Sequence, residues 1–132
     1  MTKTFLNPTT LELIIETDTA IKSQPGQFMV FLWKDALGDF ARQYSIVEQS
    51  GNRYTFTIKL SDRGRGSRLL HEISVGTSIR IRGIYGNFLL QDHQSPKIFI
   101  ATGTGLAPIY NMIRSLVLSS ERISLYFSVS TK

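Results

Sequence analysis

Three short segments carry side chains that could hold an anionic cofactor, and the first is Arg42-Gln43-Tyr44-Ser45, at the start of a predicted strand. The guanidinium of Arg42 can donate a fork of hydrogen bonds to a phosphate. The ring of Tyr44 offers a flat face for a planar heterocycle, and the hydroxyl of Ser45 can bond to a ring nitrogen. An arginine and a tyrosine on a barrel strand are often only structural, so that interpretation stays open for this segment alone.

The second segment is the loop of residues 62–68, which reads DRGRGSR. Gly64 and Gly66 would let the backbone approach a ligand closely, and we predict a short helix from Ser67 to Glu72 with Ser67 as its N-cap. Backbone N–H groups at a helix N-terminus beside arginines form a natural anion site. A basic loop without a ligand is the structural alternative.

The third segment is GTGLAP, residues 103–108, between an apolar run and a helical pattern. Glycine-rich turns from a strand into a helix cradle phosphates, although this one is not the complete dinucleotide fingerprint. The run Ile98–Ala101 before it is continuous, as in a strand buried on both faces. After it, apolar residues recur at helical spacing with Pro108 in the first turn, and Ile123–Val129 is again strand-like. Together these elements predict one β-α-β unit.

The residues before this unit are predicted to be mainly β-structure. Apolar and polar residues alternate from Leu11 to Glu16, and turn signals stand at Pro25-Gly26 and at residues 50–52. Short strands at this spacing favour an antiparallel barrel or sandwich. The further predicted strands are Phe28–Leu32, Gln43–Val47, Tyr54–Leu60 and Ser78–Arg82.

Composition narrows the function classes. The 132 residues include no cysteine, which excludes a disulfide and an iron–sulfur cluster held by the chain. His71 and His93 are isolated, so no metal site is expected, and the apolar runs are too short to span a bilayer. We expect a cytoplasmic protein. The net charge of +5 favours binding of acidic partners, such as nucleotides, acidic electron carriers or nucleic acid. Nucleic-acid binding is an alternative that only the net charge supports.

Five motifs in order carry a family resemblance: PGQF at 25–28, RxYS at 42–45, GxxS at 64–67, GxxGxF at 83–88 and GTGLAP at 103–108. The chain resembles the ferredoxin–NADP⁺ reductase superfamily, which includes reductase components of bacterial oxygenases and flavohaemoglobins. The resemblance implies a six-stranded antiparallel Greek-key flavin-binding barrel over residues 1–95. A partial α/β (βαβ) nucleotide-binding unit over residues 96–132 would follow, as the truncated start of an NAD(P)-binding domain.

The resemblance also implies roles for individual residues, with FAD as the cofactor and FMN as the rarer alternative. Tyr44 would pack on the isoalloxazine and Ser45 would lie near its reactive nitrogen, which makes these two the catalytic pair. The other residues implied for cofactor binding are Arg42, Gln43, Lys59, Leu60, Gly64, Gly66, Ser67, Arg68 and Thr104. The nicotinamide side would be formed by Gly103, Thr104 and Gly105.

The nicotinamide side departs from the family pattern. Residues 128–130 read SVS, without the arginine that the resemblance leads one to expect, and Ile84 replaces a proline of the barrel. An FAD-dependent NAD(P)H oxidoreductase is therefore implied only with an incomplete nicotinamide domain. We expect a second copy or another polypeptide to cover the α/β unit and complete that side. The alternative is a degenerate reductase-like module that binds a ligand without redox turnover.

Overall fold

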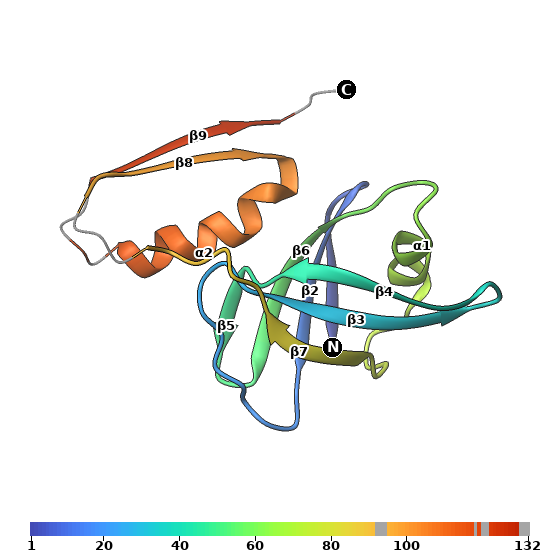
Figure 1. Ribbon diagram of the computed structural model, residues 1–132. Coiled ribbons are helices and arrows are strands. Elements are labelled where there is room, and N and C mark those ends of the chain that lie inside the picture. The colour runs from blue at the N-terminus through green and yellow to red at the C-terminus, as the bar shows by residue number, and fades with distance from the viewer. Residues whose placement is uncertain (92–94, 118, 120–121, 130–132) are drawn as a thin grey trace.

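The computed structural model describes residues 1–91, 95–117, 119 and 122–129. Figure 1 shows two parts, a β-barrel with one short helix and a smaller α/β unit above it. None of the helices in these residues is long and apolar enough to cross a membrane. Two residues that the sequence analysis singled out, His93 and Ser130, lie outside the described residues. The elements are β1 (Thr2–Asn7), β2 (Thr10–Glu16), β3 (Phe28–Asp35), β4 (Gly38–Ser45), β5 (Glu48–Ser50), β6 (Arg53–Lys59), α1 (Arg65–Glu72), β7 (Arg80–Tyr85), β8 (Lys97–Thr102), a 3₁₀ turn (Gly103–Gly105), α2 (Leu106–Leu116) and β9 (Ile123–Ser128).

The barrel is built from two antiparallel sheets. One has the strand order β1-β2-β6-β5 and the other the order β4-β3-β7. The prediction of a mainly β fold with an antiparallel barrel is confirmed. Seven strands form this part of the described chain rather than six, because the three-residue β5 makes a hairpin with β6 across the predicted turn at residues 50–52.

The barrel core follows from the alternation in the sequence. Every second residue of β2, β3 and β6 points inward and is buried, while its neighbours face outward. Phe31 lies at the centre and meets the ring of Phe56 edge-on at 5.1 Å between ring centroids. The fully or nearly buried members of this core are Leu11, Leu13, Ile15, Met29, Phe31, Trp33, Ile46, Tyr54, Phe56, Ile58, Leu60 and Leu70.

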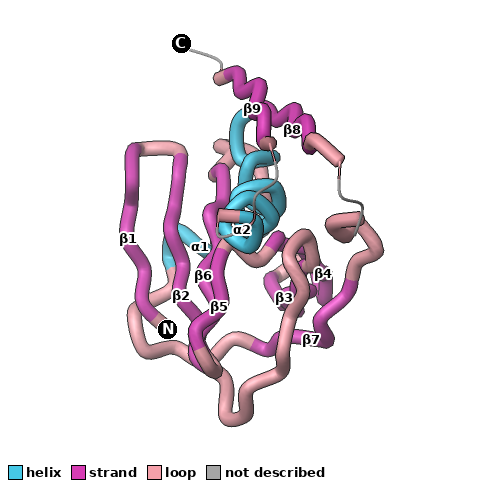
Figure 2. Tube along the Cα trace, turned by 90° about the vertical axis from the view of Figure 1, so that its left-hand side faces the viewer, coloured by secondary structure: helices cyan, strands magenta, loops and turns pink. Residues whose placement is uncertain are grey.

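The α/β unit has its own small core. β8 and β9 pair in parallel, and α2 lies between this two-stranded sheet and the barrel, as Figures 1 and 2 both show. Phe99 and Ala101 of β8 face α2 and are buried, with 8% and 7% of their surface exposed. The prediction that the run Ile98–Ala101 is buried on both faces is wrong, because Ile98 and Ile100 on the other face are 68% and 76% exposed.

Candidate functional site

The loop that leads into α1 is shaped by its own backbone. Gly64 is the N-cap of the helix, and no described side chain caps it. The N–H of Gly64 donates to the carbonyl of Ser61 (3.1 Å), and the N–H of Ser61 donates to Oγ of Ser67 (2.9 Å). The prediction of Ser67 as N-cap is therefore wrong: the helix begins at Arg65, and the Ser67 hydroxyl ties the loop together instead. The first turn consequently presents backbone N–H groups without a side-chain partner.

Gly66 brings this first turn against β4. A Cβ atom at Gly66 would lie 3.0 Å from Oη of Tyr44 and 3.2 Å from Cγ of Arg42. Such approaches are closer than ordinary van der Waals contact, so only glycine fits without displacement of its neighbours. Two segments that the sequence separates by more than twenty residues thus meet at one point.

Tyr44 is held by the barrel core on one side. Its ring meets Phe31 edge-on with 4.8 Å between centroids, and it pairs with Met29 across the β3–β4 ladder. Burial raises the pKa of Tyr44, and the nearby charge of Arg42 opposes the rise only in part. The phenol therefore stays protonated at neutral pH and keeps a proton to donate. Ser45 is half-buried beside it, whereas Gln43 and Arg42 are exposed.

Arg65 is a member of the site that the sequence analysis did not select. Its Nε donates to Oδ2 of Asp35 (2.8 Å), and its Nη2 donates to the carbonyl of Gly38 (2.9 Å). Its guanidinium also lies 4.0 Å from the ring centroid of Phe40. This arginine therefore anchors the start of α1 to the β3–β4 hairpin. The hydrogen bond with Arg65 lowers the pKa of Asp35 below its ordinary 3.8, and the same bond raises the pKa of Arg65.

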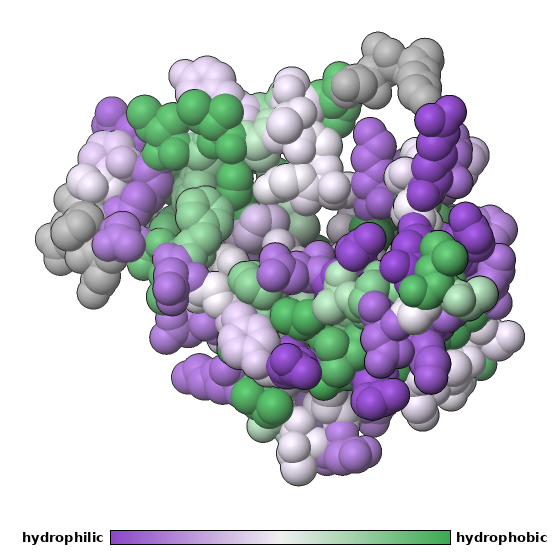
Figure 3. Space-filling view, turned by 45° about the vertical axis from the view of Figure 1, so that its right-hand side comes forward, coloured by the Kyte–Doolittle hydropathy of each residue, from purple (hydrophilic) through white to green (hydrophobic). Residues whose placement is uncertain are grey.

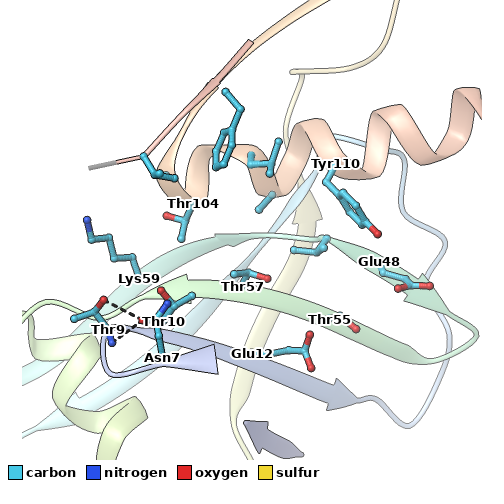
Figure 4. Close-up of a pocket in the computed structure, with 16 residues that line it drawn as sticks. Asn7, Thr9, Thr10, Glu12, Glu48, Thr55, Thr57, Lys59, Thr104 and Tyr110 are labelled. Atoms are coloured by element: carbon cyan, nitrogen blue, oxygen red, sulfur yellow. Dashed lines mark hydrogen bonds between the residues drawn. The ribbon is translucent and has the colours of Figure 1, made fainter. Parts of the chain in front are cut away.

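A cleft of about 570 Å³ separates the outer face of the barrel from the α/β unit. Its floor is polar and comes from β2, β5 and β6, and its roof is the GTG turn with the start of α2 (Figure 4). Of the predicted site residues, Lys59 lines the floor, and Gly103 and Thr104 line the roof. Gly105, by contrast, is not among the lining residues, although it lies in the same turn.

Three more of the predicted residues line a smaller hollow of about 280 Å³ beside the β6–α1 loop. Leu60, Ser67 and Arg68 line it, together with Thr9. Thr9 also lines the large cleft, and its carbonyl accepts a hydrogen bond from the N–H of Leu60 (2.7 Å). Apart from Gly105, the predicted residues thus fall into three groups, at β4 with α1, in the cleft, and in this hollow.

Two polar contacts fix α2 on the barrel at the edge of the cleft, and neither was predicted. Arg114 forms an ion pair with Glu48 (2.6 Å), and Nδ2 of Asn111 donates to the carbonyl of Ile46 (3.3 Å). The hydrogen bond with Glu48 raises the pKa of Arg114. No pattern in the sequence links these residues, since their partners lie more than sixty positions away.

Comparison with known proteins gives one family match and a consistent fold. The sequence model of a family described as the oxidoreductase FAD-binding domain matches residues 3–89. Ferredoxin–NADP reductase B of Sorangium cellulosum is 30% identical over 126 residues, which cover 92% of this chain and 52% of that protein. Component C of methane monooxygenase from Methylosinus trichosporium is 37% identical over 97 residues, covering 69% of this chain and 28% of that protein.

Solved structures share the same fold. A flavohaemoglobin from Malassezia yamatoensis, with bound FAD and haem, superposes with a TM-score of 0.90 at 18% identity, covering 98% of this chain and 37% of that one. The FAD/NAD-binding domain of a nitric oxide dioxygenase from Vibrio cholerae gives 0.87 at 20% identity, covering 98% of this chain and 60% of that one. The chain spans about half or less of the length of the two curated relatives described above.

Proposed function

The chain belongs to the family of oxidoreductase FAD-binding domains, and on that premise we propose which residues hold the flavin and how the domain is used. It is the FAD-binding domain of a ferredoxin reductase-like oxidoreductase. We propose that residues 1–95 hold the flavin and that residues 96–132 begin the nicotinamide side. The whole acts as an electron-transfer module that works with a partner.

One observation carries the assignment of residues: the close approach of Gly66 to Tyr44 and Arg42. It creates a glycine-lined cradle where the first turn of α1, with N–H groups that no side chain caps, meets the aliphatic part of Arg42. The Arg42 guanidinium donates to the carbonyl of Ala41 (2.7 Å) and lies 5.0 Å from the ring centroid of Phe40, and we propose that it turns toward the phosphates when they bind. Those donors suit a pyrophosphate, because amide groups at a helix N-terminus and an arginine fork both bind phosphate oxygens. In this proposal Arg42 and the first turn of α1 bind the phosphates, and Gly64 gives the loop its close approach.

The ring end of the cofactor lies next to this cradle in our proposal. Tyr44 packs its ring against the isoalloxazine, and Ser45 donates a hydrogen bond to the reactive nitrogen. Lys59 and Thr104 line the floor and the roof of the cleft, which also includes Val47, two residues beyond Ser45. The protein positions the ring and excludes water from one side of it, while bound flavin supplies the hydride and single-electron chemistry.

The cleft gives an electron donor access to that region. Thr104 and the polar floor around Thr57 face each other across it (Figure 4), and Phe127 of β9 also lines it. We propose NAD(P)H as the donor, entering beside Gly103. The ion pair between Arg114 and Glu48 would hold the roof at its working distance from the floor.

The α/β unit also offers a surface that fits a protein partner. Ile98, Ile100 and Tyr126 point away from α2 and are 68%, 76% and 65% exposed, and Figure 3 shows hydrophobic surface gathered on this unit. Apolar side chains that stand together on one sheet face mark a contact site. We propose that a second copy or another polypeptide covers this face, and that the net charge of +5 guides an acidic electron carrier.

The experiment that tests the proposal is an FAD titration of the purified chain, with removal of free ligand and a visible spectrum. We expect stoichiometric retention of FAD by the wild type and a large loss of affinity in Arg42→Met. Arg53→Met is the matched control, because Arg53 is an exposed arginine at the start of β6, at the other end of that strand from Lys59. Bleaching on addition of NADH or NADPH would support the donor. A wild-type chain that retains no FAD would refute the proposal and favour the degenerate module without redox turnover.

A further inference from the structure

The helix α1 has a charge distribution that opposes its own dipole. Its first turn contains no acidic residue and carries Arg65 and Arg68, and its last turn ends on Glu72. Cations at the N-terminus and an anion at the C-terminus are both unfavourable for the helix dipole. A helix of eight residues is also marginal without tertiary support. Something outside the helix must therefore hold it in place.

The structure shows such a support at the C-terminal end. The ammonium group of Lys3, on β1, donates to three carbonyl oxygens there: Leu70 (3.3 Å), His71 (2.9 Å) and Ile73 (2.7 Å). Two of these belong to the last turn of α1, where helix carbonyls lack an intrahelical partner, and the third belongs to the C-cap residue. One cation thus satisfies carbonyl groups at the negative end of the helix from almost seventy residues away.

Lys3 is itself held in place. β1 pairs with β2 from Thr2 onward, with Lys3 opposite Leu13. The ring of Phe5 lies 5.6 Å from the ammonium and packs against His71 with 5.4 Å between ring centroids. The lysine therefore joins an edge strand of the barrel to the end of α1.

We propose that Lys3 is a positioning residue for the phosphate end of the flavin site. Lys3 holds the C-terminal end of α1, and Arg65 anchors the N-terminal end to Asp35. Between these two attachments, the helix keeps its uncapped N–H groups and Gly66 against Arg42 before any ligand arrives. This inference rests on the proposed function, because it assigns to Lys3 the preorganisation of the site that binds the pyrophosphate.

The test compares Lys3→Met, which keeps an apolar chain of similar length, with Lys3→Arg, which restores donors. Lys22→Met, an exposed lysine in the loop before β3, is the control. Amide hydrogen exchange of the flavin-free chain should be faster in α1 of Lys3→Met, and slow again in Lys3→Arg. The apparent affinity is proportional to the fraction of molecules in which α1 is folded and in place. FAD affinity should therefore fall by about threefold to tenfold in Lys3→Met and recover in Lys3→Arg.

Riboflavin separates positioning from general damage, since it carries the isoalloxazine ring without a phosphate. Its affinity should be the same in Lys3→Met and the wild type, and an equal fall for riboflavin and FAD would overturn the proposal. Unchanged exchange in α1 would overturn it too, as would faster exchange with unaltered FAD affinity. If the wild type binds no FAD, the proposed function fails, and exchange in α1 alone still decides whether Lys3 holds the helix.

Discussion

Replacement of Gly66 by alanine tests the central contact of the site, because two opposing effects of the new methyl group can be separated. A Cβ atom there would lie 3.0 Å from Oη of Tyr44 and 3.2 Å from Cγ of Arg42. Comfortable contact needs about 3.5 Å or more, so the neighbours must move by roughly 0.3 to 0.5 Å. Both neighbours are residues that we assign to flavin binding.

The effect on stability is expected to be small. Alanine in place of glycine inside a helix gains about 1 kcal/mol of helix propensity. Overpacking of a tight contact costs about 1 to 3 kcal/mol. The free energy of unfolding should therefore fall by no more than about 2 kcal/mol, and the chain should remain folded. Urea denaturation followed by the fluorescence of Trp33, the single tryptophan and a core residue, measures this change.

The effect on FAD should be larger than the effect on folding. Movement of Tyr44 and Arg42 disturbs both the ring face and the phosphate fork, and we expect FAD affinity to fall by about tenfold or more, which corresponds to about 1.4 kcal/mol. Glu72→Ala serves as the control, since it changes an exposed position of the same helix. A folded Gly66→Ala variant that binds FAD as tightly as the wild type would refute the argument that this contact shapes the site.

Two further predictions concern the elements around the site. Gly26 has a φ of +98°, and a Cβ there would collide with the carbonyl of Phe88 and the side chain of Met112. Gly26→Ala should therefore lower the free energy of unfolding by about 2 kcal/mol or more in urea denaturation, and a loss below about 0.5 kcal/mol would contradict this packing. Arg65 lowers the pKa of Asp35 from 3.8, so the ion pair stabilises the folded chain above that pH and its contribution is lost as the pH falls through the lower folded value. Asp35→Asn should thus unfold more easily at neutral pH, and the difference in unfolding free energy from the wild type should shrink as the pH falls from 3.8 through the lower folded value. A difference that does not shrink on acidification would contradict the assignment.

The sequence predicted those strands whose two faces differ. β2, β3 and β6 each bury alternate residues, so their pattern of apolar and polar residues was visible. β1 is an edge strand with five of its six residues exposed, and no residue of β4 is fully buried, so neither strand contrasts a buried face with an exposed one as β2, β3 and β6 do. β1 was consequently missed, and β4 begins at Gly38 rather than Gln43 because the hairpin after Asp35 extends it.

The backbone of the candidate site was predicted as far as its contacts are local. The glycines and Ser67 lie within one loop, and their motif located the start of α1 to within two residues. The error about the N-cap arose because Ser67 bonds backwards to Ser61 instead of to its own helix. The partners of Arg65 and Lys3 could not be found in this way, since they lie about thirty and seventy residues away and depend on which strands the barrel brings beside α1.

The charges of α1 nevertheless contain a signal that can be used in other chains. A helix normally places anions in its first turn, whereas this sequence places Arg65 and Arg68 there, and both oppose the helix dipole even though Arg65 is paired with Asp35. Proteins break local rules of this kind mainly at functional sites and compensate elsewhere. In this chain the compensation at the C-terminal end is Lys3, and the positive end is left for a ligand of opposite charge. A short helix with cations in its first turn and no acidic cap is therefore a reason to look for a phosphate when a distant lysine stabilises its last carbonyls, because the first two features alone would only weaken the helix.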